Sequence, residues 1–165
     1  MSAQRLWAPW RMQYVQGERK DEGCIFCLAA GPGDDQARLV LHRGERCLLM
    51  LNAFPYNSGH LMVSPHRHVA SIERLDDDEL LELMTLTQRA LRAVRETYAP
   101  DGFNLGVNEG EVAGAGFAGH VHLHVVPRWA ADSNFMAVTA YTRVLPQSRE
   151  DSYAQLRERF ARLQS

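Results

Sequence analysis

One segment of the chain, residues 119–129, alternates histidine with aliphatic residues and constrains the fold more than any other part of the sequence. His120, His122 and His124 stand at every second position, with valine or leucine between them. Successive side chains of an extended chain point to opposite faces, so this spacing predicts a strand with one apolar face and one row of imidazoles. A solvated strand face is typically built from Thr, Lys or Glu, and three aligned histidines therefore indicate chemistry.

The remaining hydrophobic pattern mixes short strands with two amphipathic helices. The first helix is predicted from Asp76 to Tyr98, with apolar side chains at Leu80, Leu83, Met84, Leu91, Val94 and Tyr98. The second is predicted from the apolar spacing at Tyr153, Leu156, Phe160 and Leu163. Further strands are predicted within residues 37–52, as a pair about the turn at 43–45, and within 54–65 and 102–110. Because helices and strands do not alternate regularly, we expect an α+β domain with an antiparallel sheet of about five strands.

Length and charge limit the partners that the chain can have. Its 165 residues, 45% of them hydrophobic, suit one domain with a single core. A net charge of −2 argues against binding to nucleic acid or to an anionic membrane. The first residues contain no apolar signal region, and the longest aliphatic run, residues 48–51, is far too short to span a bilayer. We expect a cytoplasmic protein without nucleic acid or membrane partners.

The cysteines predict a metal site. Cys24 and Cys27 form a CxxC pair, whereas Cys47 lies in a predicted strand and is expected to be buried. An odd count suits metal binding in a reducing compartment, and nothing resembles the thioredoxin unit that a redox pair would need. A closed zinc site needs four ligands, so histidines must complete it. His68, at the end of a predicted strand, and His120 are the candidates.

Two other features receive no role in the site. His42, His60 and His66 are predicted to be exposed or hydrogen-bonded to the backbone. The arm at residues 1–20 is rich in Trp and Arg without a clear period. It either caps the core of this domain or contacts a site or a neighbouring subunit.

The sequence HVHLHVV at residues 120–126 resembles the motif of the histidine triad (HIT) family. Residues 48–69 are similar to the nucleotide-binding strands of that family, and residues 102–110 to the strand before its glycine loop. The resemblance covers residues 24–129 of a single domain, 1–165, and leaves the arm and a C-terminal extension with a helix, 130–165. It implies a compact α+β fold, usually a homodimer, that binds a nucleotide and cleaves at its α-phosphate through a nucleotidyl-histidine.

The resemblance also implies ligands and nucleotide contacts. Zinc-bearing members place the metal on residues that match Cys24, Cys27, His68 and His120, one zinc for each chain. Asn52 matches a ribose-binding position and Asn108 a polar residue near the phosphates. The chain has Gly116 and Phe117 where many members carry Gln-Ser or Gln-Thr, so no hydroxyl is supplied there. The sequences LWAPWRM, NSGHLMV and HVVPRW are most similar to the short enzymes that act on diadenosine tetraphosphate, some of which use phosphate instead of water.

The chemistry of the triad can be argued from imidazole itself. A nucleophile for a phosphoanhydride must be neutral at pH 7 and leave again easily, and His122, flanked on both sides, is the best candidate. His124 would help to hold the phosphate oxygens, and His120 would support the site through its metal. Backbone N–H groups of the glycine-rich loop at 110–119 could bind the developing negative charge. Arg128 could add positive charge or form a surface ion pair.

We therefore expect a nucleotidyl hydrolase or transferase that acts on dinucleoside polyphosphates through His122. One alternative is a zinc metallohydrolase in which His120 and His122 bind a catalytic metal, because His-x-His pairs can do so. Another is a zinc-stabilised nucleotide sensor with negligible turnover. The first leaves the CxxC pair without a purpose, and the second does not need three aligned histidines. Phosphate and water remain equal candidates for the acceptor.

Overall fold

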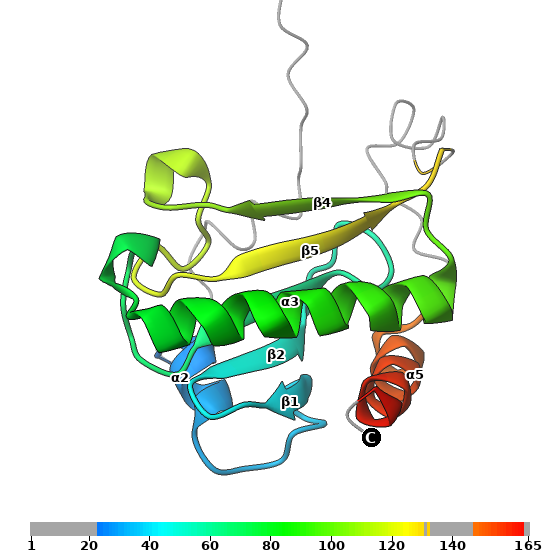
Figure 1. Ribbon diagram of the computed structural model, residues 1–165, viewed down its shortest axis with the longest axis horizontal. Coiled ribbons are helices and arrows are strands. Elements are labelled where there is room, and N and C mark those ends of the chain that lie inside the picture. The colour runs from blue at the N-terminus through cyan, green and yellow to red at the C-terminus, as the bar shows by residue number, and fades with distance from the viewer. Residues whose placement is uncertain (1–22, 131, 133–146, 164–165) are drawn as a thin grey trace, which may run out of the picture.

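A single antiparallel sheet organises the chain. The computed structural model describes residues 23–130, 132 and 147–163 (Figure 1). The strands are β1 (Val40–Arg43), β2 (Cys47–Leu51), β3 (Leu61–Pro65), β4 (Gly102–Val107) and β5 (Leu123–Arg128). Their order across the sheet is β1-β2-β3-β5-β4, and every neighbouring pair is antiparallel.

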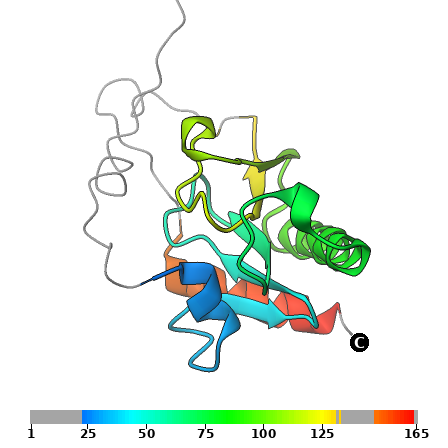
Figure 2. The same cartoon turned by 90° about the vertical axis from the view of Figure 1, so that its left-hand side faces the viewer.

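The helices cover the sheet from both sides. They are α2 (Ile25–Ala30), α3 (Asp77–Tyr98) and α5 (Arg149–Arg162), with short 3-10 turns at Ile72–Arg74 and Glu111–Ala113. α3 and α5 share the larger core cluster with one face of the sheet, and α2 packs on the other face (Figure 2). The predicted α+β fold, with five antiparallel strands and two main helices, is confirmed. The predicted arm at residues 1–20 lies outside the described residues.

α3 begins and ends where its sequence dictates. The side chain of Asp76 accepts a hydrogen bond from the Glu79 N–H, and the side chain of Glu79 accepts one from the Asp76 N–H, which completes a capping box. Ala99 closes the helix in the left-handed conformation. The prediction that Met84 belongs to the buried stripe is wrong, because its side chain is 47% exposed. The helix turns about 100° per residue, which carries Met84 away from the fully buried Leu83 beside it.

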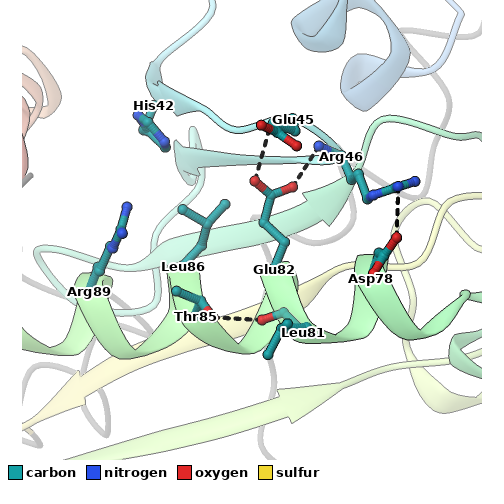
Figure 3. A pocket seen from close by; sticks show the side chains of 9 residues that line it. All are labelled: His42, Glu45, Arg46, Asp78, Leu81, Glu82, Thr85, Leu86 and Arg89. Carbon is teal, nitrogen blue, oxygen red and sulfur yellow. Dashed lines mark hydrogen bonds and ion pairs between the residues drawn. The ribbon is translucent and has the colours of Figure 1, made fainter.

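A glutamate fastens the hairpin of β1 and β2 to α3. Glu82 reaches across a cleft of about 360 Å³ (Figure 3). Its carboxylate accepts hydrogen bonds from the backbone N–H groups of Glu45, Arg46 and Cys47, at 2.9, 2.5 and 2.8 Å. Arg46 in turn pairs with Asp78 at 2.8 Å. The cleft therefore lies on the α3 side of the sheet. No helix of the described segments has the length and apolar character needed to cross a membrane.

The histidine segment is a strand only in its second half. β5 begins at Leu123, where its ladders with β3 and β4 both end, so the prediction of a strand from residue 119 is wrong for the first part. His120 and His122 instead lie in the irregular approach to the strand, although the N–H of Val121 still bonds the carbonyl of Val69 at 2.7 Å. The aliphatic residues of the segment are buried in the α3 core cluster. The histidines therefore lie on the opposite, α2 side.

Candidate active site and metal centre

Four potential metal ligands from three parts of the chain converge beside α2. They are Cys24, Cys27, His68 and His120, and their ligand atoms all lie within 4.8 Å of one another. Cys24 is the N-cap of α2, and Cys27 follows one turn later. The Nδ1 atom of His120 lies 3.3 Å from the Cys24 Sγ and 3.6 Å from the Cys27 Sγ. The Nδ1 atom of His68 lies 3.2 Å from the Cys27 Sγ.

These residues fit a tetrahedral metal ion. Zn–S bonds of about 2.3 Å and Zn–N bonds of about 2.0 Å place neighbouring ligand atoms roughly 3.3 to 3.8 Å apart. The Nε2 atom of His120 lies 2.9 Å from the Pro65 carbonyl, so this nitrogen carries the proton and Nδ1 offers its lone pair to the cysteines. Burial, the hydrogen bond that the Cys27 thiol donates to Cys24 and the charge of Cys24 raise the pKa of the Cys27 thiol. A bound cation would offset that repulsion between thiolates.

His122 has the proton arrangement of a neutral nucleophile. Its Nδ1 lies 2.8 Å from the carbonyl oxygen of His120, and its side chain is buried. Because the carbonyl can only accept, we assign the proton to Nδ1 and the lone pair to Nε2. Burial lowers the pKa of His122, although the hydrogen bond to the His120 carbonyl opposes this shift. The imidazole therefore stays neutral at pH 7, as the sequence analysis required.

His60 belongs to the same site, and the prediction that left it without a role is wrong. Its side chain is fully buried, and its Nε2 lies 3.0 Å from the Nδ1 of His124. The N–H of Tyr56 donates to the Nδ1 of His60, so the proton of His60 lies on Nε2 and points to His124. His124 then carries its own proton on Nε2. Burial, and then the nearby imidazoles of His124 and His122, lower the pKa of His60 to about 3.

His66 is hydrogen-bonded to the backbone as predicted, whereas His42 is half-buried against a ring. The Nε2 of His66 lies 3.0 Å from the backbone carbonyl of Gly44. His42 packs against Phe160, with ring centroids 5.2 Å apart, on the α5 side of the sheet. The position of His60 two residues before Met62 of β3 could have distinguished it from His42 and His66 in the sequence. His60, Met62 and the strand partner of Met62, His124, share one face of the sheet.

The predicted nucleotide contacts are distributed over four places. Asn52 lies beside His60, with its Nδ2 atom 3.4 Å from that ring, and its Oδ1 atom accepts from the Phe54 N–H at 2.9 Å. Asn108 directly follows β4, one residue beyond the Val107 that pairs with Leu123. Asn108 therefore lies just past the end of the ladder, where the histidine segment enters β5.

Gly116 and Phe117 lie in the turn that leads to the triad. Gly116 is exposed, and Phe117 accepts the His120 N–H at its carbonyl, at 3.2 Å. Arg128 is at the far end of β5 from His122. It forms an ion pair with Asp132 and donates to the Oδ1 of Asn104 at 2.7 Å. The structure thus favours the surface ion pair that the sequence left open, and does not bring Arg128 to the histidines.

An aromatic side chain of α2 connects the metal ligands to the triad. The ring centroid of Phe26 lies 5.1 Å from that of His120 and 4.5 Å from that of His122. On its other side Phe26 meets Phe117 edge to face, at 5.9 Å. The rings of His122 and His124 are 4.8 Å apart. The potential metal ligands, His122 and His124 therefore form one continuous cluster.

Comparisons with known proteins identify the family. A model of the HIT domain matches residues 34–131. The AP-4-A phosphorylase of Mycobacterium tuberculosis is 41% identical over 166 residues, which cover 96% of this chain and 85% of that protein. An uncharacterised HIT-like protein of Methanocaldococcus jannaschii is 33% identical over 66% of this chain and 81% of its own length. The chain therefore belongs to the histidine triad family.

A solved structure agrees with this assignment. The zinc-bound histidine triad family protein of Mycobacterium smegmatis superposes with a TM-score of 0.66 and 28% identity, covering 86% of this chain and 96% of that one. A histidine triad nucleotide-binding protein of Sulfolobus tokodaii, 24% identical, has the same fold with a TM-score of 0.67 and covers 86% of this chain and 94% of that one.

Proposed function

We propose that the protein cleaves dinucleoside polyphosphates, such as diadenosine tetraphosphate, at the α-phosphate through a nucleotidyl intermediate on His122. The observation that carries this proposal is the hydrogen bond of 2.8 Å from the Nδ1 of His122 to the His120 carbonyl. It leaves a lone pair on Nε2 of a neutral, buried imidazole, which is the form that attacks phosphorus. The relative from M. tuberculosis that is 41% identical is an AP-4-A phosphorylase, which supports the substrate class.

The first step would form one bond and break one. The Nε2 lone pair of His122 attacks the α-phosphorus, and the bond to the bridging oxygen of the leaving polyphosphate breaks with its electron pair. That oxygen accepts a hydrogen bond from the Nε2–H of His124, which stabilises the negative charge that it gains. The His60 Nε2–H, 3.0 Å from the Nδ1 of His124, holds the ring in the tautomer that can donate this hydrogen bond.

The second step would return the enzyme to its starting state. An oxygen of water or of inorganic phosphate attacks the phosphorus, and an attacking water releases its proton to the solvent. The P–N bond then breaks, and its electron pair returns to the Nε2 of His122. Asn52, Asn108 and the backbone at Gly116 and Phe117 are the proposed contacts to the nucleotide and its phosphates. Arg128 is not included, because it is paired with Asp132.

We propose zinc as the metal of the cysteine and histidine cluster. Two thiolates and two imidazoles are the ligand set that structural zinc sites use. When bound, zinc would supply a fixed positive charge that joins α2 to the segments after β3 and before β5. The cluster gathers His120 but not His122, whose Nδ1 is engaged by a carbonyl. This favours a nucleophilic His122 over the metallohydrolase alternative, which needs both rings on one metal.

A homodimer through β4 is the proposed assembly. Within the described part of the chain β4 pairs only with β5, so its outer edge offers unpaired backbone groups. Leu105 on β4 and Met84 on α3 are each 47% exposed. Leu105 pairs with Val125 of the α3 core cluster, so both exposed side chains lie on the α3 side of the sheet. A second copy could cover them. We place this nucleotide enzyme in the cytoplasm, with neither nucleic acid nor membrane as a partner.

Product analysis tests the activity. The purified protein is incubated with diadenosine tetraphosphate, with and without millimolar phosphate, and the products are separated. ADP with ATP identifies phosphorolysis, and AMP with ATP identifies hydrolysis. Binding of the substrate without turnover would instead support a nucleotide sensor. Turnover of an adenosine phosphoramidate, with no cleavage of any dinucleoside polyphosphate, would exclude the substrate class.

A further inference from the structure

We infer that Phe26 is a positioning residue, through which the cysteine-bearing helix α2 holds the His122 imidazole in its reactive orientation. The inference rests on the proposed role of His122 and extends it to a residue that touches neither metal nor substrate. Phe26 is one residue away from Cys27 and two from Cys24. Contacts that hold these cysteines in place therefore also hold the Phe26 ring in place.

The Phe26 ring packs against two histidines of the triad. Its ring is inclined by 30° to that of His122, with centroids 4.5 Å apart, so the two rings lie nearly face to face. It is inclined by 41° to that of His120 at 5.1 Å. Pairs of rings at such separations attract each other beyond the effect of the area that they bury. Phe26 thus blocks one side of His122 and limits rotation of its ring.

Full burial separates this role from substrate binding. The exposed fraction of Phe26 is 0%, so the ring has no surface with which to meet a nucleotide. Its other neighbours are aliphatic residues of β1 and β2 and the methionines of the sheet, namely Val40, Leu48, Met50 and Met62. The hydrogen bond from Nδ1 fixes one atom of His122, and the packing of Phe26 fixes the plane of its ring.

α2 needs an anchor to keep this contact. The helix has six residues, and no side chain caps its N-terminus. Isolated helices shorter than about 12 residues are marginal in water, so α2 depends on its tertiary contacts. At its start those contacts are the approaches of Cys24 and Cys27 to His120 and His68. The cluster would therefore act on His122 through Phe26 as well as through His120.

The test compares two phenylalanines. Phe26→Leu removes the ring from His122, and Phe160→Leu is the matched control, because Phe160 is 1% exposed, lies on a helix and packs against His42 at 5.2 Å. We expect both variants to lose similar thermal stability. Only Phe26→Leu should lose about tenfold in kcat with KM unchanged, because the nucleophile is misplaced by a fraction of an ångström. A rise in KM at constant kcat, or an equal loss of kcat in both variants, would overturn the inference.

A second measurement does not depend on turnover. In the zinc-loaded native protein the His122 Nδ1–H should give a slowly exchanging proton NMR signal, and Phe26→Leu should broaden it by exchange, whereas Phe160→Leu should not. The inference fails if the signal is unchanged in Phe26→Leu. If no substrate is cleaved but the signal responds as expected, the proposed function fails while the positioning role stands.

A double-variant cycle tests the link to the cysteines. Cys27→Ser should weaken the same NMR signal, and combining it with Phe26→Leu should add little, because both changes would act through one contact. If the losses of NMR signal in the two single variants multiply in the double variant, Cys27 and Phe26 act independently. That result would overturn the link. Zinc content measured on each variant distinguishes loss of metal from loss of packing.

Discussion

The imidazoles of His60 and His124 lie 3.0 Å apart, Nε2 to Nδ1, although 64 residues separate them in the chain. Tyr56 fixes the proton of His60 from one side, and His60 in turn fixes that of His124. The chain of donors runs from a backbone N–H, through two rings, to the position at which the leaving oxygen would accept a hydrogen bond.

Removing the donor on His60 should weaken the hydrogen bond from His124 to the leaving oxygen. His60→Phe keeps an aromatic ring but no N–H, and we expect kcat to fall by about two orders of magnitude, as when one donor to a developing negative charge is lost. A substrate whose leaving oxygen gains little charge should lose much less. His66→Phe is the control, because His66 bonds only the Gly44 carbonyl beside the hairpin. Equal losses on both substrates would contradict the proposed role.

His60 should also make the folded protein less stable in mild acid. The pKa of His60 is about 3 in the folded protein and 6.5 in its ordinary state. Between about pH 3 and pH 6.5, therefore, His60 binds a proton in the unfolded chain but not in the folded protein. The free energy of unfolding therefore decreases as pH falls below 6.5, by about 1.4 kcal/mol for each pH unit, and is unaffected by His60 above it. Urea titrations from pH 7 to 4 measure this slope. A His60→Phe protein with the native slope would refute the assignment.

His122 should be indispensable. His122→Ala should lose at least about three orders of magnitude in turnover, because the nucleophile supplies the reaction path. Rapid quenching in denaturant at alkaline pH, which spares a P–N bond, with substrate labelled at the α-phosphate, should trap nucleotide on the native chain. Inversion at a chiral α-phosphorus without trapped label would indicate direct attack by water.

The metal cluster should hold about one zinc per chain. Cys24→Ser should lose the metal and lower the melting temperature, because a structural zinc adds its binding energy to the folded state. Cys47→Ala is the control. Cys47 is fully buried, and its surroundings raise the pKa of its thiol to about 12. The Cys47→Ala variant should therefore keep its zinc. Unaltered melting of Cys24→Ser, with no zinc in the native protein, would exclude the site.

The dimer should depend on the edge of the sheet. Leu105→Lys places a charge on β4 and should give monomers in analytical ultracentrifugation. Leu81→Lys is the matched control, since Leu81 is 69% exposed on α3 and lines the cleft beside the β1–β2 hairpin, away from β4. A native protein that sediments as a monomer at micromolar concentration would contradict the proposal.

Local patterns were enough to predict most of the fold. The acidic start of α3 is a capping box, and the turn at 43–45 does join two strands. The period of the histidines also identified their common face. Local sequence patterns do not determine strand register, however. The pairing of Met62 with His124, which brings His60 into the site, is formed between segments about 60 residues apart. The beginning of β5 at Leu123 likewise depends on where its partners end.

His120 contributes to the site through two chemically independent groups, because its ring faces the cysteines while its carbonyl accepts the proton of His122. Every amino acid has that carbonyl. Mutational drift at this position could therefore erase a metal ligand and still leave the neighbouring proton in place.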